Sequence, residues 1–148
     1  MTIEEAINTI EWLDVHINDA LESKVAPVVK HEISDAVVGQ YVYGAHDPIP
    51  VFYASRRGRG SGGIGDESVM ESHVYDMTLT ITDTSQLQNL WSDTWQADVA
   101  TIVQEGSKQF HQPKPRPFME EAVRDAIDSG KIDQALRDGL AVNGLIVD

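Results

Sequence analysis

The sequence contains no cysteine in its 148 residues, and this absence excludes several kinds of site. Without thiols the chain cannot form disulfide bonds, thiolate metal sites or cysteine nucleophiles. Long hydrophobic runs are also missing, since no apolar stretch approaches the roughly 18 to 20 residues of a membrane span. The first ten residues, MTIEEAINTI, are acidic, unlike the basic start of a signal peptide. We therefore expect a soluble protein that is not exported and does not bind a membrane.

Basic residues are scarce, with 11 lysines and arginines against 24 acidic residues and a net charge of -13. Such a charge keeps subunits soluble and repels nucleic acid, because duplex binding depends on cationic side chains that contact phosphates. The acids gather at the two ends: residues 1–40 hold eight of them against two lysines, and residues 118–148 hold seven against three basic residues. General DNA binding is therefore disfavoured, and both ends are expected to form acidic helices.

Catalytic signatures are missing too, since the chain has no GxSxG turn, no GxxxxGK[ST] phosphate loop and no GxGxxG unit. His31 and Glu32 with Asp35 resemble half of a zinc-binding HExxH helix, but the second histidine is absent. His73 and Asp76 would point to opposite faces of a strand. We predict that the protein is not an enzyme and that it holds neither a metal ion nor a cofactor.

The N-terminal 25 residues have the periodicity of an amphipathic helix. Thr2 and Glu5 form a capping-box pair at its start. Pro27 predicts a kink or break, after which a helical stripe resumes as far as Gly39. This stripe packs either in the protein's own core or partly against a neighbouring subunit, and the sequence favours the first interpretation without excluding the second. The apolar positions of the first helix recur at steps of three and four: Ile3, Ile7, Ile10, Leu13, Ile17, Leu21 and Val25.

The remaining elements predict an α+β fold with a long N-terminal amphipathic helix, a small, mostly antiparallel sheet and C-terminal helices, in a single domain over residues 1–148. Residues 75–82 alternate apolar and polar side chains and predict the best strand. A short helix before Gly106 precedes a proline-rich connection at 107–117. A helix then begins at Pro117, and a last helical turn or two ends at Leu140.

A glycine- and arginine-rich loop at residues 56–66 has two interpretations. Arg56, Arg57 and Arg59 are interleaved with glycine as in segments that bind single-stranded nucleic acid. The same guanidinium groups can pair bidentately with carboxylates on an adjacent acidic subunit, and we favour this second interpretation. Trp91 and Trp95, which lie among polar residues, are candidates either for the core or for the same contact.

Residues 100–123, ATIVQEGSKQFHQPKPRPFMEEAV, resemble the C-terminal signature of a siphophage tail-component family, the tail-completion or head-tail joining proteins. The central residues are also similar to one branch of these proteins, in which a tyrosine and paired arginines precede a glycine-rich stretch. The chain departs from the pattern at Ser107, where a threonine is common, and at Ala54-Ser55, which separate Tyr53 from the arginines. The matching elements are Val103, Glu105-Gly106, Pro113, Pro115, Arg116-Pro117-Phe118-Met119, and Tyr53 with Arg56-Arg57.

This resemblance implies a structural virion protein, located in the neck or tail and assembled in the host cytoplasm as a ring of identical subunits. Its partners would be neighbouring neck and tail proteins, and the genome would pass through the ring without specific binding. An acidic lumen would let DNA slide. Gly106 would end one helix, and Pro117 and Phe118 would begin and anchor the next. The rivals are a nucleic-acid-binding module acting through the arginine loop and an enzyme with a dispersed site.

Overall fold

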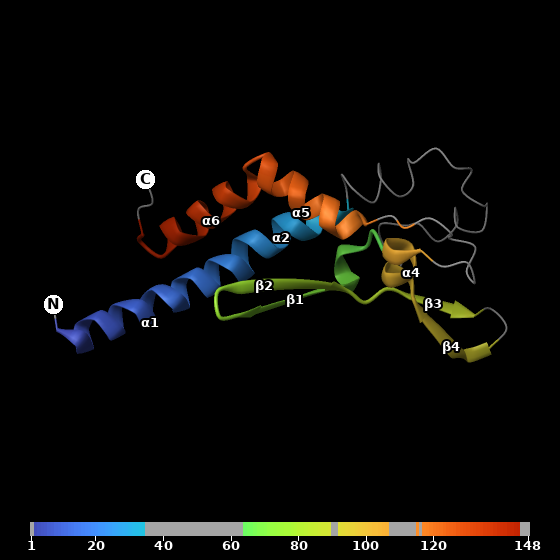
Figure 1. The fold of residues 1–148 in the computed structure, drawn as a ribbon, viewed down its shortest axis with the longest axis horizontal. Helices are drawn as coiled ribbons and strands as arrows, with labels where there is room; N and C mark the ends of the chain where they lie inside the picture. Colours follow the sequence, from blue (N-terminus) through green and yellow to red (C-terminus); the bar gives the residue numbers. More distant parts are fainter. Residues whose placement is uncertain (1, 35–63, 90–91, 107–114, 116, 146–148) are drawn as a thin grey trace.

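The computed structural model describes residues 2–34, 64–89, 92–106, 115 and 117–145. A long helical rod runs through the molecule, with a β-hairpin along one side and the C-terminal helices along the other (Figure 1). A second hairpin and a short helix lie at the end of the rod opposite the N-terminus (Figure 1). The predicted α+β class is therefore confirmed. Within these ranges, no helix is long and apolar enough to cross a membrane.

The rod consists of α1 (Ile3–Ala20), a π-helical turn η1 (Leu21–Val25) and α2 (Ala26–His31). The predicted capping box is present: the Glu5 N–H donates to the Thr2 Oγ1 at 3.1 Å, and the Thr2 N–H donates to the Glu5 side chain at 2.6 Å. Such a box satisfies two backbone donors that have no partner within the helix.

Of the kink or break predicted at Pro27, the break does not occur, because the helix continues through the proline. The Ala26 N–H instead donates to the Leu21 carbonyl, five residues back, and the backbone stays right-handed helical at Val25, Ala26 and Glu32. A proline ring crowds the preceding helical turn and lacks the N–H that would bond there. Widening that turn to a π-turn accommodates the ring without ending the helix.

The predicted single strand at residues 75–82 instead spans the tip of a β-hairpin. Tyr75 ends the first strand, and only residues 78–82 lie in the second. β1 (Met70–Tyr75) pairs antiparallel with β2 (Thr78–Asp83), with Val74 opposite Leu79. Asp76 and Met77 form the two-residue turn with φ of 49° and 56°. Turns of this kind normally carry Asn-Gly or Asp-Gly, so the Asp-Met pair gave no turn signal. The Met77 N–H donates to the Asn18 side chain at 2.9 Å, which ties the tip to α1.

A second hairpin, which the sequence analysis did not predict, follows the first. It pairs β3 (Gln86–Asn89) with β4 (Ser92–Asp98), and the register shifts between Gln88 and Asn89. A short 3-10 helix, η3 (Glu67–Val69), precedes the first hairpin. The residues of β3 and β4 are mostly polar and lack the alternation that marks a half-buried strand.

The C-terminal helices occur where the sequence places them. α4 (Val99–Glu105) ends at Gly106, whose φ of 79° is the left-handed conformation that favours glycine. α5 (Phe118–Asp128) begins immediately after Pro117, and Gly130 separates it from α6 (Lys131–Val142). α6 has 12 residues and is longer than the predicted turn or two.

The core lies at the second half of the rod, not along its whole length. Phe118 at the start of α5 is fully buried beside Val29 and Ile33 of the rod and Met70 of β1. By contrast, Ile3 is 82% exposed. The favoured interpretation that the whole N-terminal stripe packs in the core is therefore wrong for the first half of α1.

A candidate interaction groove

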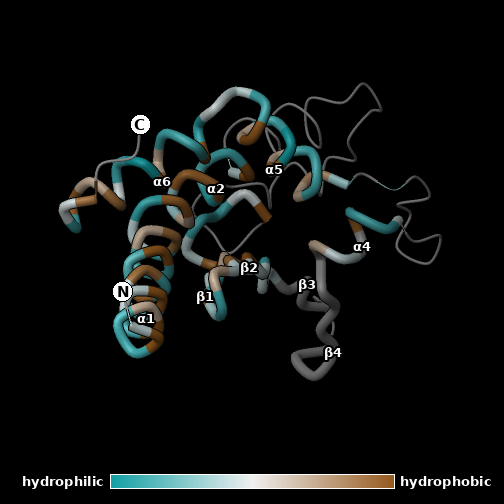
Figure 2. Tube along the Cα trace, turned by 60° about the vertical axis from the view of Figure 1, so that its left-hand side comes forward, coloured by the Kyte–Doolittle hydropathy of each residue, from teal (hydrophilic) through white to brown (hydrophobic). Residues whose placement is uncertain are grey.

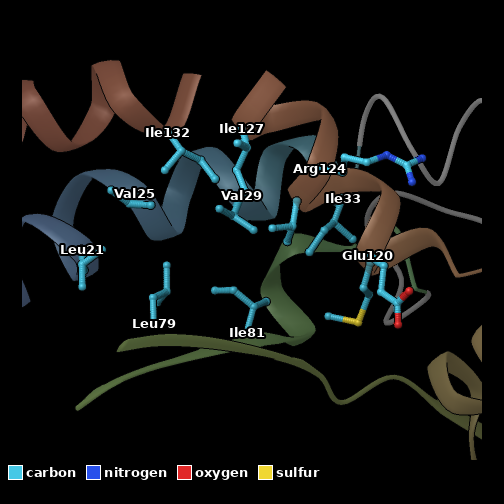
Figure 3. A pocket seen from close by; sticks show the side chains of 12 residues that line it. Leu21, Val25, Val29, Ile33, Leu79, Ile81, Glu120, Arg124, Ile127 and Ile132 are labelled. Atoms are coloured by element: carbon cyan, nitrogen blue, oxygen red, sulfur yellow. The ribbon is translucent and has the colours of Figure 1, made fainter. Parts of the chain in front are cut away.

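An apolar groove of about 640 Å³ opens between β2 and α5, with the rod as its floor (Figure 3). The side chains of Leu79 and Ile81 point into it from β2, and those of Ile127 and Ile132 point into it from the opposite wall (Figure 3). The groove is lined by Leu21, Val25, Val29, Ile33, Leu79, Ile81, Met119, Glu120, Val123, Arg124, Ile127 and Ile132.

Each wall of the groove follows from a simple periodicity. The floor residues Leu21, Val25, Val29 and Ile33 recur every four positions and therefore lie on one side of the rod. On β2 the period is two, so Leu79 and Ile81 share the face that meets the rod. On α5 a second four-residue step places Met119, Val123 and Ile127 in one row. The apolar groove is thus formed by the rod, β2 and α5, and Ile132 of α6 completes its lining.

The groove has little polar chemistry. Among its lining residues only Glu120 and Arg124 carry charge, and both lie at the Ile33 end (Figure 3). The Arg124 guanidinium pairs with Glu121 on its own helix, and its side chain is 61% exposed. No lining side chain is a hydroxyl, thiol or imidazole, and Glu120 carries the one carboxylate among the lining residues. This largely apolar arrangement is suited to binding apolar side chains.

The apolar surface continues beyond the groove along α1. Hydrophobic positions recur along this helix in Figure 2, and they extend the row of Leu21 and Val25 toward the N-terminus. Ile7 is 50% exposed and Ile10 is 65% exposed. Monomeric proteins rarely leave a contiguous row of large apolar side chains in water, so this surface has the character of an interaction site.

Asp35 lies outside the described residues, and the other titratable residues of the candidate sites do not gather at one point. The His31 Nδ1 lies 3.1 Å from the Glu67 Oε1, whereas the buried Glu32 side chain pairs with Lys131. His73 is exposed on the outer face of β1, and Asp76 lies in the hairpin turn. Among the described residues, no three histidine, aspartate or glutamate side chains are grouped so that they could hold a metal ion.

The predicted interface residues fall largely outside the described part of the chain. Arg56, Arg57, Arg59 and Trp91 lie there, as do most of the 56–66 loop and the 107–117 connection. Trp95 belongs to β4, but its side chain is outside the description as well.

The signature residues Gly106, Pro117 and Phe118 lie in the described part of the chain. Gly106 adopts its left-handed conformation directly after α4. Pro117 occupies the cap position of α5, one residue before the helix rather than its first residue. Phe118, the first residue of α5, has no exposed surface. The signature therefore has a structural basis, because it places the first residue of α5 in the core.

Sequence reasoning did not predict that the first half of α1 is exposed, although the signal was present. The row of three- and four-residue steps continues from Ile3 to Ile33, a span of about 45 Å at 1.5 Å per residue. A domain of about 150 residues has a radius of gyration of about 15 Å and cannot cover a helix of this length completely. The length of the stripe was thus evidence that part of it lies outside the core.

Nearly the whole chain matches one known protein family. The family model named YomN matches residues 4–142, which is nearly the whole chain. The chain belongs to the YomN family. This family derives from Bacillus phages, and the protein is therefore phage-associated. Neither the curated proteins nor the solved structures include a significant match to this YomN-family protein.

Proposed function

We propose that this protein is a non-enzymatic structural subunit of a tailed phage, a tail-completion or head-tail joining protein that assembles into a ring around the DNA conduit. The observation that carries the proposal is the match of a phage-derived family to residues 4–142. The resemblance of residues 100–123 to the tail-component signature makes the proposal more specific, because it points to the neck or tail within the virion.

The geometry of the signature supports a structural role. Gly106 and Phe118 occur on either side of the proline-rich connection, one at the end of α4 and the other buried under α5. Both residues fix the course of the backbone, and neither presents a reactive group to a cavity. A sequence signature made of such residues is typical of a shared fold and assembly and not of a shared reaction.

The groove and the exposed face of α1 support assembly. They are predominantly apolar surfaces, and subunits of permanent complexes have interfaces of this kind. The net charge of -13 suits a conduit wall along which DNA slides, because it weakens contact with phosphates.

The proposal is tested on phage particles. Purified virions labelled with an antibody against this chain should show it at the neck or tail in electron micrographs. A phage that lacks the chain should accumulate DNA-filled heads that are not joined to functional tails. Virions that contain none of the protein would contradict the proposal.

The rival function, a nucleic-acid-binding module, has its own test. If Arg56, Arg57 and Arg59 grip nucleic acid, the protein should retard labelled DNA or RNA in low salt, and the triple alanine variant should not. We expect no retardation by either protein, because the net charge of -13 opposes binding. Retardation that the triple variant loses would establish the rival.

A further inference from the structure

The apolar residues along one face of α1 follow a heptad pattern. Ile3, Ile7, Ile10 and Ile17 recur at alternating steps of four and three, with Asp14 at the remaining position. In coiled coils, residues with this spacing form the seam that packs on a second helix. Ile3 is 82% exposed, Ile7 50% and Ile10 65%, so these turns of the seam are open to a partner. The seam is about 21 Å long at 1.5 Å per residue.

The two edges of this seam differ in charge. Glu4 and Glu11 lie seven residues apart, each directly after a seam isoleucine, so both belong to one edge. Both are exposed, and among the described residues neither side chain has a hydrogen-bond or ion-pair partner. The other edge carries Ala6 and Leu13 and is uncharged. The apolar seam is therefore bordered on one side by carboxylates that are available for pairing.

The hairpin and α6 occupy the same two edges farther along the rod. Asn18, seven residues after Glu11, accepts the Met77 N–H at 2.9 Å on the acidic edge. On the uncharged edge, Ala20 packs against Gly139. The N-terminal turns of α1 project beyond both elements (Figure 1). A second helix could therefore reach the seam and both of its edges over these turns.

We propose that the seam of α1 binds a helix of a different protein, whose apolar residues repeat in heptads and whose facing edge carries lysine or arginine. The partner's cations pair with Glu4 and Glu11, and one further cation within its seam meets Asp14. The capping box keeps α1 helical as far as its first turn, so little order has to be gained on binding. This surface goes beyond the proposed function, because it specifies the chemistry of a partner and needs no particular place in the virion.

A second copy of α1 does not fit the same seam. Two parallel copies would place one Asp14 carboxylate against the other within an apolar layer, where no cation repays their desolvation. Two antiparallel copies would bring Glu4 and Glu11 of one helix against the same edge of the other, and like charges in contact oppose pairing. Residues 3–20 hold five acids and no lysine or arginine. The charge of the seam thus calls for a partner of different sequence.

Other candidates for the partner lack the same cations. Residues 118–148, which include α5 and α6, hold seven acids against three basic residues, so the C-terminal helices of a second copy offer no cationic edge. An anionic lipid surface is disfavoured as well, because helices that lie on membranes carry lysine and arginine on their polar face. A basic amphipathic helix remains the occupant that satisfies both the apolar seam and its acidic edge.

Binding of designed peptides to the full-length protein tests this surface. The probe is a labelled three-heptad peptide with leucine at the seam positions, lysine at the edges and one lysine within the seam, followed by fluorescence anisotropy. We expect it to bind about tenfold more tightly than a peptide with the same leucines and glutamate at the edges. A scrambled peptide of the same composition keeps the charge but has no seam. If the scrambled peptide binds as tightly as the lysine peptide, the proposal is overturned.

Substitutions in α1 test the seam and its edge separately. Ile7→Asp combined with Ile10→Asp should abolish binding of the lysine peptide without changing the circular dichroism, because both residues are at least half exposed. The matched control is Val15→Asp, since Val15 is 62% exposed but lies outside the seam, and this variant should still bind. Glu4→Lys combined with Glu11→Lys should reverse the preference, so that the glutamate peptide binds more tightly. An unchanged preference in this charge variant would overturn the proposal.

The same variants identify a different occupant. Self-association of the wild-type protein that Ile7→Asp with Ile10→Asp removes, and Val15→Asp retains, would assign the seam to a second copy. Binding to phosphatidylglycerol vesicles with that dependence would assign it to a membrane. Either result would overturn the proposal.

These outcomes are separate from those of the phage experiment. A protein present at the neck that binds neither peptide would overturn the proposed surface and leave the proposed function standing. A protein that binds the lysine peptide but is absent from virions would do the reverse.

Discussion

Replacing Gly139 with alanine should destabilise the fold, because a Cβ atom at this position collides with the rod. It would lie 2.6 Å from the Ala20 Cβ and 2.9 Å from the Ala20 Cα, whereas carbon atoms in contact are about 3.5–4.0 Å apart. The Ala20 Cα belongs to the backbone, so a change of rotamer cannot relieve the collision. α6 and α1 would have to separate by about 1 Å.

Two opposing terms set the size of the effect. Overpacking of this kind costs about 1–3 kcal/mol, and the backbone contact puts Gly139 at the upper end of that range. Alanine is favoured over glycine inside a helix by about 1 kcal/mol, which offsets part of the loss. We expect Gly139→Ala to lower the free energy of unfolding by about 2 kcal/mol. In a chain of this size, that corresponds to a decrease in Tm of about 4–8 °C.

Urea unfolding followed by circular dichroism measures this loss, and a second substitution supplies the control. Ala20→Gly alone should lose about 1 kcal/mol through helix propensity. The double variant exchanges the two side chains, so it removes the closest contact, at 2.6 Å with the Ala20 Cβ, and cancels the propensity terms, while the 2.9 Å contact with the Cα of residue 20 stays. It should therefore be about 2 kcal/mol more stable than the sum of the single losses predicts. A Gly139→Ala protein as stable as the wild type, or strictly additive losses, would refute the role of this contact.

Three further substitutions test other parts of the fold by the same unfolding assay. Phe118→Ala should lose about 3–5 kcal/mol, because it empties a fully buried position, and a loss below 1 kcal/mol would contradict its anchoring role. Met77→Gly should gain about 1 kcal/mol, because Met77 has a φ of 56° that strains a side chain, and an equal or lower stability would count against that strain. Lys131→Met should lose about 1–3 kcal/mol, because it leaves the buried Glu32 carboxylate without its partner, whereas Lys131→Arg should retain most of the stability.

The groove itself was not predictable from periodicity. Leu79, Val123 and Ile132 each belong to an ordinary half-apolar element, and such residues normally pack on one another. Such elements either pack against one another and bury their apolar faces, or they leave a groove between them. The outcome depends on the distances between them where they pack on the rod. That separation is set by side chains distant in sequence, such as Phe118 beneath α5, and not by any local pattern.

Local rules determined much of this protein. The capping box at Thr2, the left-handed end at Gly106 and the start of α5 after Pro117 are each specified by residues within a few positions of one another, so the sequence alone placed them correctly. The composition likewise excluded disulfide bonds and thiolate sites. The resemblance of residues 100–123 to a phage family indicated a phage protein from the sequence alone.

Tertiary structure decided the features that depend on distant contacts. The strand predicted at residues 75–82 turns back at Met77, where the Asn18 side chain of α1 accepts the Met77 backbone N–H. Pro27 lies within a continuous rod because the preceding π-turn accommodates its ring. It also left the apolar row of α1 outside the core. Hydrophobic periodicity indicates that one face of a helix is apolar. Only the tertiary structure shows whether other elements of the same chain cover that face.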